Sequence, residues 1–443
     1  MRINLPKRKN LIYLFIILIL FNLLSTNLHN GIDSLKNPLI SSSTNDCDLE
    51  WSLLWGTPGT QGGKGIAIDK MNNIYQTGYI MDGPFGNNDG LLIKYNSKGE
   101  QLWNTTWGTE FVDSGFDLAI DSKNNIYVGG TIDGQYGHNY KIILLKYDGF
   151  MTKLWNRTWD LMVDPRTPHV AIDSQDNIYV ITYAGNYQND VVILKYDNNG
   201  NLLWERIWGG SEDDGTHGID ICIDSYNDII IGGCTRSLII GQAEGFISKY
   251  DSSGNNLWNT TWGGPGIDGI RAIGVDKANN IYISGYTDSF GTGTQNVFLA
   301  KCDSQGSPIW NKTWAGIGGA ISRDLVLGLY GNIYLTGKTY DGTQEFMFLL
   351  KYDKEGNLIC DKTWGSSGLN MNEGWGITKD LVNNIYISGC IEHYVGYRVV
   401  LIKYSMNKPE SNKIHSYDIF LLISVISTII TAKIIKNIKK IRK

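Results

Sequence analysis

Residues 118–130 read Leu-Ala-Ile-Asp-Ser-Lys-Asn-Asn-Ile-Tyr-Val-Gly-Gly, and this stretch decides the fold of the 443-residue chain. An apolar run leads to Asp121, a polar Asn-Asn pair follows, and a second apolar run ends in glycine. Asp and Asn tolerate turn geometry, whereas the flanking runs are rich in strand-forming residues. The stretch therefore predicts a β-hairpin.

The same hairpin recurs seven times along the chain. Its second apolar run begins at a fixed spacing of 51 or 52 residues, at Ile74, Ile126, Ile178, Ile229, Ile281, Ile333 and Ile385. A period near 50 residues is typical of β-propellers. Each unit contains four strand-like runs, which in the second unit cover 116–121, 125–132, 141–147 and 153–159. Four antiparallel strands per unit predict a propeller blade.

The ends of the repeat predict how the ring closes. Seven third runs are marked by Lys-Tyr or Lys-Cys, but only six fourth runs, marked by Trp-x-x-x-Trp or its variant Cys360/Trp364, follow them. The missing fourth run is at the front, where Trp51 and Trp55 have the same spacing. Since an open sheet edge invites aggregation, we expect residues 49–55 to pair with the strand that ends at Tyr404. The fold class is thus an all-β seven-bladed propeller over residues 47–404.

The two ends of the chain predict a membrane protein. Residues 1–29 combine a basic start with an apolar run and are typical of a signal peptide or an uncleaved signal anchor. A polar tether (30–46) precedes the propeller, and a linker (405–416) follows it. Residues 417–435 then form a predicted transmembrane helix, with 436–443 as a basic cytoplasmic tail. The alternative for this C-terminal segment is an amphipathic helix at the membrane surface. The expected location is the cell membrane, with the propeller outside the cell.

The charge distribution excludes one class of partner. Residues 47–404 hold 26 of the 39 Lys and Arg and 40 of the 44 Asp and Glu, which gives 26 − 40 = −14. Proteins that bind nucleic acids rely on basic residues that contact phosphates. We therefore expect no nucleic acid partner.

The repeat also resembles a known family. The phrase Trp-Gly-Gly-Pro-Gly-Ile-Asp-Gly at 262–269, followed by the hairpin at 275–285, is similar to the seven-bladed β-propeller (SBBP) repeat of bacterial and archaeal surface proteins. The resemblance covers residues 49–404 and implies an extracellular display fold with no catalytic residues. The repeat departs from the pattern at Asp160, Thr182, Ala315 and Gly328.

One position of the first run predicts a polar ring in the central channel. It lies four residues before the turn aspartate and is occupied by Gly65, Asp117, His169, Asp220, Ala272, Asp324 and Gly376. Asp117, His169, Asp220 and Asp324 could hold a hard cation such as Ca²⁺, which is the one cofactor that the sequence suggests. The alternative is a wet polar channel in which Lys64, Arg271 and Arg323 neutralise the carboxylates. The turn aspartates themselves are explained by turn capping.

Two further sets of residues concern modification and packing. Four N-glycosylation sequons occupy the same place in the fourth run, at Asn104, Asn156, Asn259 and Asn311. They predict a glycoprotein, unless each Thr is present only as a strand former. Cysteine occurs at repeat positions held elsewhere by Ala, Tyr or Trp and is interpreted as a small core residue, apart from Cys47 in front of the first strand. No Cys-x-x-Cys motif supports zinc or redox chemistry.

Three functions remain open. The leading one is a non-enzymatic scaffold that binds an extracellular protein, a glycan or the cell envelope, because no catalytic set stands out. In that case specificity would lie where the repeats differ, at Phe116, His169, Ile219, Arg271 and Trp375. The second is a hydrolase or lyase that uses Asp117, Asp220, Asp324 and His169. The third is a purely structural envelope component.

Overall fold

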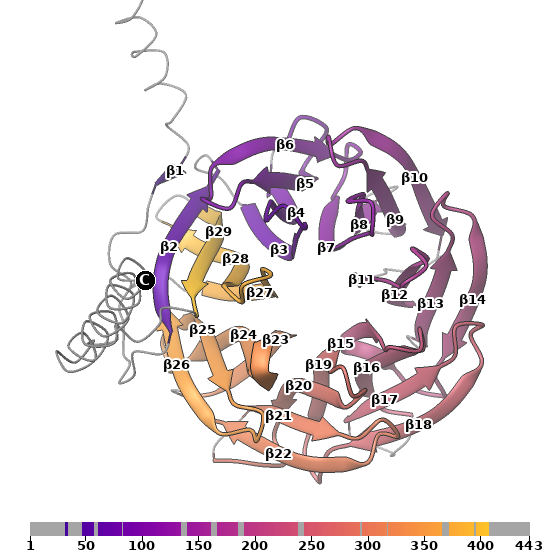
Figure 1. The fold of residues 1–443 in the computed structure, drawn as a ribbon, viewed down its shortest axis with the longest axis vertical. Helices are drawn as coiled ribbons and strands as arrows, with labels where there is room; N and C mark the ends of the chain where they lie inside the picture. Colours follow the sequence, from indigo (N-terminus) through magenta and orange to yellow (C-terminus); the bar gives the residue numbers. More distant parts are fainter. Residues whose placement is uncertain are drawn as a thin grey trace, which may run out of the picture.

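The computed structural model describes residues 32–33 and 47–406, except for 57–60, 82, 134–139, 161–165, 185–189, 238–242, 293–294, 317, 366–371 and 394–395. Seven antiparallel sheets stand around a central axis, as Figure 1 shows face-on. Six sheets have four strands and the seventh has five. The predicted all-β seven-bladed propeller is therefore confirmed.

The blades follow one another along the chain, each from its inner to its outer strand. Blade 1 contains β3 (Gln61–Ile68), β4 (Ile74–Met81), β5 (Asn88–Tyr95) and β6 (Gln101–Trp107). Blade 2 contains β7 (Ser114–Ile120), β8 (Ile126–Asp133), β9 (Tyr140–Tyr147) and β10 (Lys153–Asp160). Blade 3 contains β11 (Arg166–Ile172), β12 (Ile178–Ala184), β13 (Asp190–Tyr196) and β14 (Leu202–Trp208). Blade 4 contains β15 (Asp214–Ile223), β16 (Ile229–Thr235), β17 (Glu244–Tyr250) and β18 (Asn256–Trp262).

The remaining blades repeat this order. Blade 5 contains β19 (Asp268–Val275), β20 (Ile281–Thr287), β21 (Asn296–Cys302) and β22 (Pro308–Trp314). Blade 6 contains β23 (Ala320–Leu327), β24 (Ile333–Tyr340), β25 (Glu345–Tyr352) and β26 (Leu358–Trp364), with a short 3₁₀ helix η1 (Leu329–Gly331) in its first turn. Blade 7 contains β27 (Asn372–Lys379), β28 (Ile385–His393) and β29 (Gly396–Ser405).

Blade 7 is completed by the N-terminal strand β2 (Asp48–Trp55). This strand runs antiparallel to β29, with Leu53 opposite Leu401, and the two lie side by side at the left of Figure 1. The predicted closure by residues 49–55 is confirmed. The two-residue strand β1 (Ile32–Asp33), which the repeat did not predict, adds to the outer side of β2.

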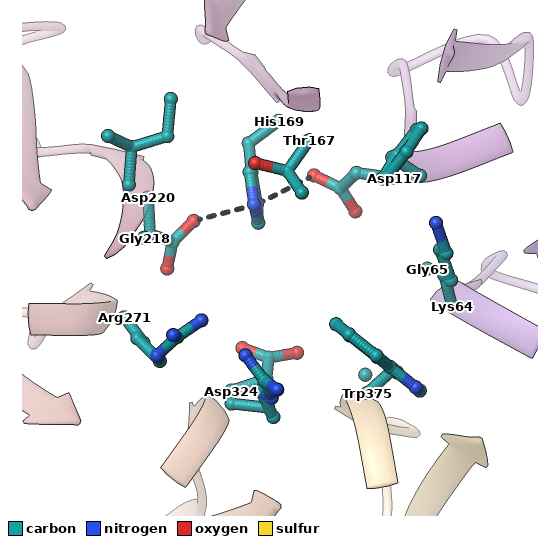
Figure 2. A pocket seen from close by; sticks show the side chains of 14 residues that line it. Lys64, Gly65, Asp117, Thr167, His169, Gly218, Asp220, Arg271, Asp324 and Trp375 are labelled. Carbon is teal, nitrogen blue, oxygen red and sulfur yellow. Dashed lines mark ion pairs between the residues drawn. The ribbon is translucent and has the colours of Figure 1, made fainter. Parts of the chain in front are cut away.

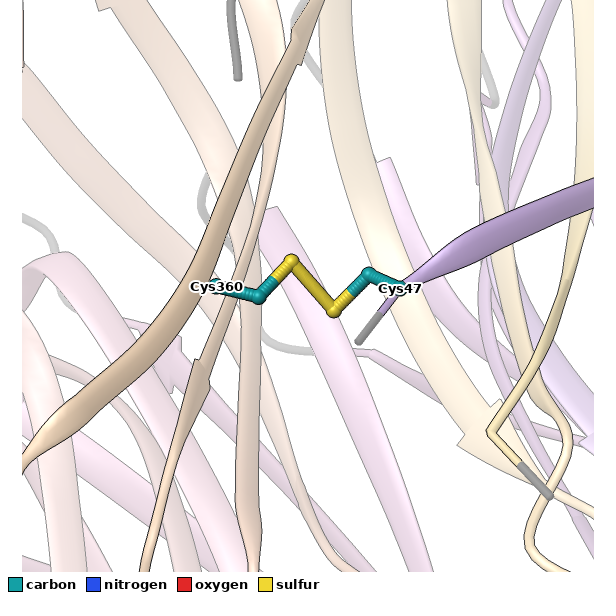
Figure 3. Close-up of a disulfide and its surroundings, with 2 residues drawn as sticks. All are labelled: Cys47 and Cys360. Atoms are coloured by element: carbon teal, nitrogen blue, oxygen red, sulfur yellow. A yellow bond between two sulfur atoms is a disulfide. The ribbon is translucent and has the colours of Figure 1, made fainter. Parts of the chain in front are cut away.

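A disulfide ties the closing strand to the neighbouring blade. Cys47, at the start of β2, bonds to Cys360 on β26 of blade 6 (Figure 3). The interpretation of Cys360 as a core filler was wrong, because its partner lies 313 residues away in sequence and is brought near only by ring closure. Cys234, Cys302 and Cys390 are free and buried, as expected of small core residues.

The recurrent turn residues cap their own hairpins. In blade 2, Oδ1 of Asp121 accepts hydrogen bonds from the backbone amides of Lys123 (2.9 Å) and Asn125 (2.8 Å). Its Oδ2 accepts from the buried Tyr127 hydroxyl at 3.2 Å. Asn124 has φ of 63°, the left-handed region that Asn tolerates better than other side chains. The turn aspartate is thus accounted for by turn capping alone.

The hydrophobic core lies between adjacent blades. One cluster, for example, joins Tyr75 and Leu92 of blade 1 to Val128 and Leu145 of blade 2, all almost completely buried. Because each blade contributes to the clusters on both its sides, the ring behaves as one rigid support for the side chains that face the channel.

The strand register shows where the chain enters and leaves the ring. Lys379, Ile385, Tyr404 and Leu49 follow one another across blade 7 at the edge that carries the hairpin turn. Asp48 pairs with Ser405 at this same edge. The strand that closes the ring therefore begins where the last strand ends.

The predicted signal segment (1–29), transmembrane helix (417–435) and cytoplasmic tail (436–443) lie outside the described residues. A search of the part of the chain that is described finds no helix long and apolar enough to cross a membrane.

Candidate functional site

The inner strands surround a cavity in the central channel. It has a volume of about 110 Å³ and is lined by residues from all seven inner strands, shown in close-up in Figure 2. Its walls consist of two tiers. The rim tier contains Lys64, Phe116, Arg271, Arg323 and Trp375, and the carboxylate tier contains Asp117, His169, Asp220 and Asp324.

β-Bulges between the first two strands of a blade position the rim-tier side chains. The register between the first two strands of a blade skips Phe116 in blade 2, Arg323 in blade 6 and Trp375 in blade 7. It also skips Arg271 in blade 5 and Lys64 in blade 1. An unpaired residue at a β-bulge turns its side chain in a new direction. Each bulge here adds a different side chain to the channel wall.

The three aspartates of the carboxylate tier bond to backbone. Asp117 accepts hydrogen bonds from the amides of Leu118 (2.8 Å) and Val170 (2.9 Å). The amide of Val170 belongs to β11, so this side chain joins blade 2 to blade 3.

The same arrangement recurs in the two other blades that carry this aspartate. Asp220 accepts from Ile273 of blade 5 and Asp324 from Ile377 of blade 7, each at 2.8 Å. The aspartates thus connect blades in pairs. This structural role was not predicted, since it depends on an amide in the next repeat.

His169 lies between two of these aspartates. Its Nδ1 is 3.7 Å from Oδ2 of Asp117 and 3.4 Å from Oδ1 of Asp220, as the dashed lines in Figure 2 mark. Burial by itself disfavours the imidazolium, but the hydrogen bond to Asp220 and the charges of Asp220, Asp117 and Asp324 outweigh it. Together they raise the pKa of His169 to about 9. The imidazolium is therefore the form present at neutral pH.

Asp324 lies apart from that group, on the opposite side of the channel in Figure 2. Burial, followed by repulsion from Asp220, raises its pKa to about 8, against the effect of the Ile377 amide. The predicted ring is thus divided into a trio of Asp117, His169 and Asp220 and a separate Asp324. No group of three or more His, Cys, Asp or Glu side chains suited to a metal is found within the described ranges. The Ca²⁺ site stays a prediction.

The rim tier is rich in contacts between cations and aromatic rings. Nζ of Lys64 lies 3.4 Å from the centre of the Phe116 ring, and Cζ of Arg323 lies 4.5 Å from that of Trp375. Arg323 also donates from Nε to Oε1 of Glu373 at 2.5 Å. Its ion-pair partner is therefore Glu373 rather than the Asp324 that follows it in sequence.

Two residues of this region were not recognised from the sequence. The carboxylate of Glu373 is buried beside Arg323. Thr167 lines the cavity with φ of 55°, a conformation that a β-branched residue rarely adopts. Each rim-tier residue stands one position before the predicted ring residue of its repeat. A comparison of the seven repeats at that position would have identified these residues as a set.

The four sequon asparagines lie on the outer strands β6, β10, β18 and β22. All four side chains are exposed. This geometry is compatible with glycosylation, which stays a prediction.

Comparisons with known proteins agree on the fold. No family model matches the chain. An uncharacterised WD repeat-containing protein of Acanthamoeba polyphaga mimivirus is 26% identical over 270 residues, which cover 50% of this chain and 17% of the viral protein. The chain therefore spans less than a fifth of the length of this curated relative.

Solved structures with a similar fold include enzymes and a protease domain. A polysaccharide lyase of the ulvan lyase family PL25 superimposes with a TM-score of 0.50 and 12% identity, over 79% of this chain and 95% of the lyase. The propeller domain of the trilobed protease from Pyrococcus furiosus gives a TM-score of 0.47 and 10% identity, over 81% of this chain and all of that domain. At these identities the likeness concerns the propeller fold alone.

Proposed function

We propose that this chain is a membrane-anchored, extracellular β-propeller of the SBBP type that binds a ligand at the mouth of its channel without chemical turnover. The observation that carries this proposal is the rim tier. On a ring whose core and turns repeat from blade to blade, the bulges present different charged and aromatic side chains to one cavity. Variation at one place on a rigid support is typical of binding sites.

Two observations support a location outside the cell. The Cys47–Cys360 disulfide is of a kind that persists in oxidising compartments. The four exposed sequons are placed where glycans would cover outer strands.

The polarity of the ring supports the proposed anchoring. Both Asp48 and Ser405 lie at the turn edge of blade 7, whereas Gly374 and Leu54 mark the opposite edge. Trp375 follows Gly374 directly, so the rim tier lies away from the point where a C-terminal anchor would begin. A propeller held in this way would present its channel mouth to the surroundings.

A hydrolase or lyase is the weaker candidate. Catalysis by paired carboxylates needs one group that accepts or donates a proton and a second one about 5–9 Å away. Asp117, Asp220 and Asp324 each hold two backbone amides, and moving them would disturb the joint between blades. These carboxylates are explained by structure, and a purely structural envelope protein would need no rim tier.

The test is ligand screening with the full-length protein in detergent micelles, against arrays of glycans and cell-envelope extracts. We expect binding that Trp375→Ala abolishes and that Tyr226→Ala leaves intact. Tyr226 is the matched control because it is also aromatic and is 74% exposed in the hairpin turn of blade 4. Equal binding by both variants, or release of cleaved glycan by the wild type, would overturn the proposal.

A further inference from the structure

The side chains of two cations of the rim tier have no ion-pair partner. Among the described residues, the side chains of Lys64 and Arg271 form no hydrogen bond and no ion pair. The ammonium of Lys64 lies 3.4 Å from the centre of the Phe116 ring, and the guanidinium of Arg271 lies 5.4 Å from that of the Tyr286 ring. Nε of Arg271 is buried and has no acceptor. A buried donor without an acceptor is rare in native proteins and calls for an explanation.

The other charged side chains around the cavity have hydrogen-bond or ion-pair partners. Arg323 pairs with Glu373, and His169 is shared by Asp117 and Asp220. Asp324 accepts from the amides of Leu325 and Ile377. Lys64 and Arg271 are therefore the two cations around the cavity whose side chains have no carboxylate partner among the described residues.

The electrostatics of the cavity disfavours the charged forms of these two side chains. Burial and then repulsion from Arg323 lower the pKa of Arg271 to about 10. Burial also lowers the pKa of Lys64 to about 7, and Arg323 acts in the same direction, against the attraction of Cys390 and Glu373. The charge of Arg323 thus disfavours the charged forms of both Lys64 and Arg271, and a bound anion would favour them.

The backbone beside the cavity points to a site as well. Thr167 lines it in the left-handed conformation, with φ of 55°. Strain of this kind in a β-branched residue persists where the surrounding structure enforces it, and it gathers at ligand sites.

The size of the cavity restricts what can enter. Its volume of about 110 Å³ is well below the roughly 300–1,000 Å³ of pockets that enclose drug-sized ligands. It has room for several water molecules or for one small oxyanion.

We propose that Lys64 and Arg271 together hold an oxyanion in the channel, namely a carboxylate or sulfate group. Arg271 would supply the planar donor set that matches such a group, and Lys64 a compact charge from another wall of the channel, as Figure 2 shows. The inference rests on the proposed binding function and specifies its ligand as one that carries an anionic group. The group is either the acidic substituent of a glycan or a free ion of the same chemistry.

Calorimetric titration of the full-length protein in micelles tests this inference. Three ligands are titrated separately: trigalacturonate, maltotriose as a neutral sugar of equal length, and sodium sulfate. We expect trigalacturonate to bind at least tenfold more tightly than maltotriose, and Arg271→Gln and Lys64→Met each to weaken it at least tenfold. Tighter binding of trigalacturonate than of sulfate identifies a glycan substituent as the source of the anion, whereas equal binding identifies a free ion.

The matched control is Arg206→Gln. Like Arg271, Arg206 lies near an aromatic ring, with Cζ 5.2 Å from the centre of the Trp204 ring, but its guanidinium donates to three backbone carbonyls on the outside of the propeller. We expect this variant to bind as the wild type does. If it loses affinity to the same extent as Arg271→Gln, the effect is one of general charge and the inference is wrong.

Proton uptake gives a second measurement that needs no variant. At pH 8 the free Lys64 is mainly neutral, and a bound anion would favour its charged form. Binding should therefore take up protons, which titrations in two buffers of different ionisation enthalpy detect. Absence of uptake contradicts the role of Lys64.

The outcomes separate this inference from the proposed function. If a neutral ligand binds in a way that Trp375→Ala abolishes and Arg271→Gln does not, the channel is a binding site but not for an anion. If neither acidic nor neutral ligands respond to Trp375→Ala, both proposals fail.

Discussion

The disulfide between Cys47 and Cys360 makes a quantitative prediction about the closure of the ring. The change is the double variant Cys47→Ser/Cys360→Ser, which frees the start of β2 from blade 6 (Figure 3). The bond spans 313 residues of sequence. The loop-entropy relation gives a stabilisation of about 5.7 kcal/mol for a loop of this length, as an upper value.

Native disulfides contribute about 2–5 kcal/mol when measured, and we expect a loss in that range. With an unfolding entropy of about 2.1 cal/mol/K per residue over roughly 350 residues of the ring, this corresponds to a decrease in Tm of about 3–7 °C. The variant should also make Leu54 and the core around Val400 more accessible to solvent. In the variant, β2 is held only by the ladder to β29 and by the packing of its side chains.

The assay is thermal unfolding followed by circular dichroism, with and without reducing agent. The wild type under reducing conditions should melt like the double variant, and the double variant should not respond to the reductant. Cys222→Ser, which changes a free and half-buried cysteine, is the control and should keep the response. A double variant that melts with the wild type would refute the claim that this bond holds the ring closed.

Three further predictions concern the channel and the outer strands. The pKa of His169 is raised to about 9 from its ordinary 6.5, so its stabilising effect is complete below pH 6.5 and is lost as the pH rises through 9. In urea unfolding, the wild type should therefore be more stable than His169→Gln by about 1–3 kcal/mol at pH 6 and equally stable at pH 10. A difference that stays constant with pH would contradict this assignment. Asp220→Ala leaves the amides of Ile221 and Ile273 without acceptors and should destabilise the ring by about 2–4 kcal/mol. The variant should also lower the pKa of His169, which an NMR titration of its imidazole measures. An unchanged pKa would exclude the contact between His169 and Asp220. Protein from a glycosylating host should lose mass on enzymatic deglycosylation, and replacing the four sequon asparagines by glutamine should remove that loss, whereas identical masses before and after treatment would show that Asn104, Asn156, Asn259 and Asn311 are unmodified.

Much of the fold could be predicted because it repeats. The hairpin at 118–130 recurs at a fixed period, its Asp and Asn bond within the same turn, and the missing fourth run identifies β2 as the closing strand. Each of these features depends on residues close together in one repeat, or on counting repeats.

The candidate site was predicted only in part, because its contacts cross between repeats. The acceptor role of Asp117 toward Val170 and the disulfide of Cys360 each need a partner far away in sequence. The ion pair of Arg323 with Glu373 joins neighbouring blades in the same way. The predicted ring of Asp117, His169, Asp220 and Asp324 correctly selected one level of the channel. It did not reveal that the residues one position earlier, on the bulges, contain the unmatched cations.

The most direct test of the central claim is a crystal of the protein soaked in selenate, an oxyanion whose selenium can be located by anomalous scattering. The proposed site predicts a selenium peak in the channel, with selenate oxygens within hydrogen-bonding distance of the guanidinium of Arg271 and of Nζ of Lys64. The same soak of Arg271→Gln crystals should lack that peak. Selenate bound elsewhere on the molecule, with the channel between Lys64 and Arg271 empty, would contradict the claim.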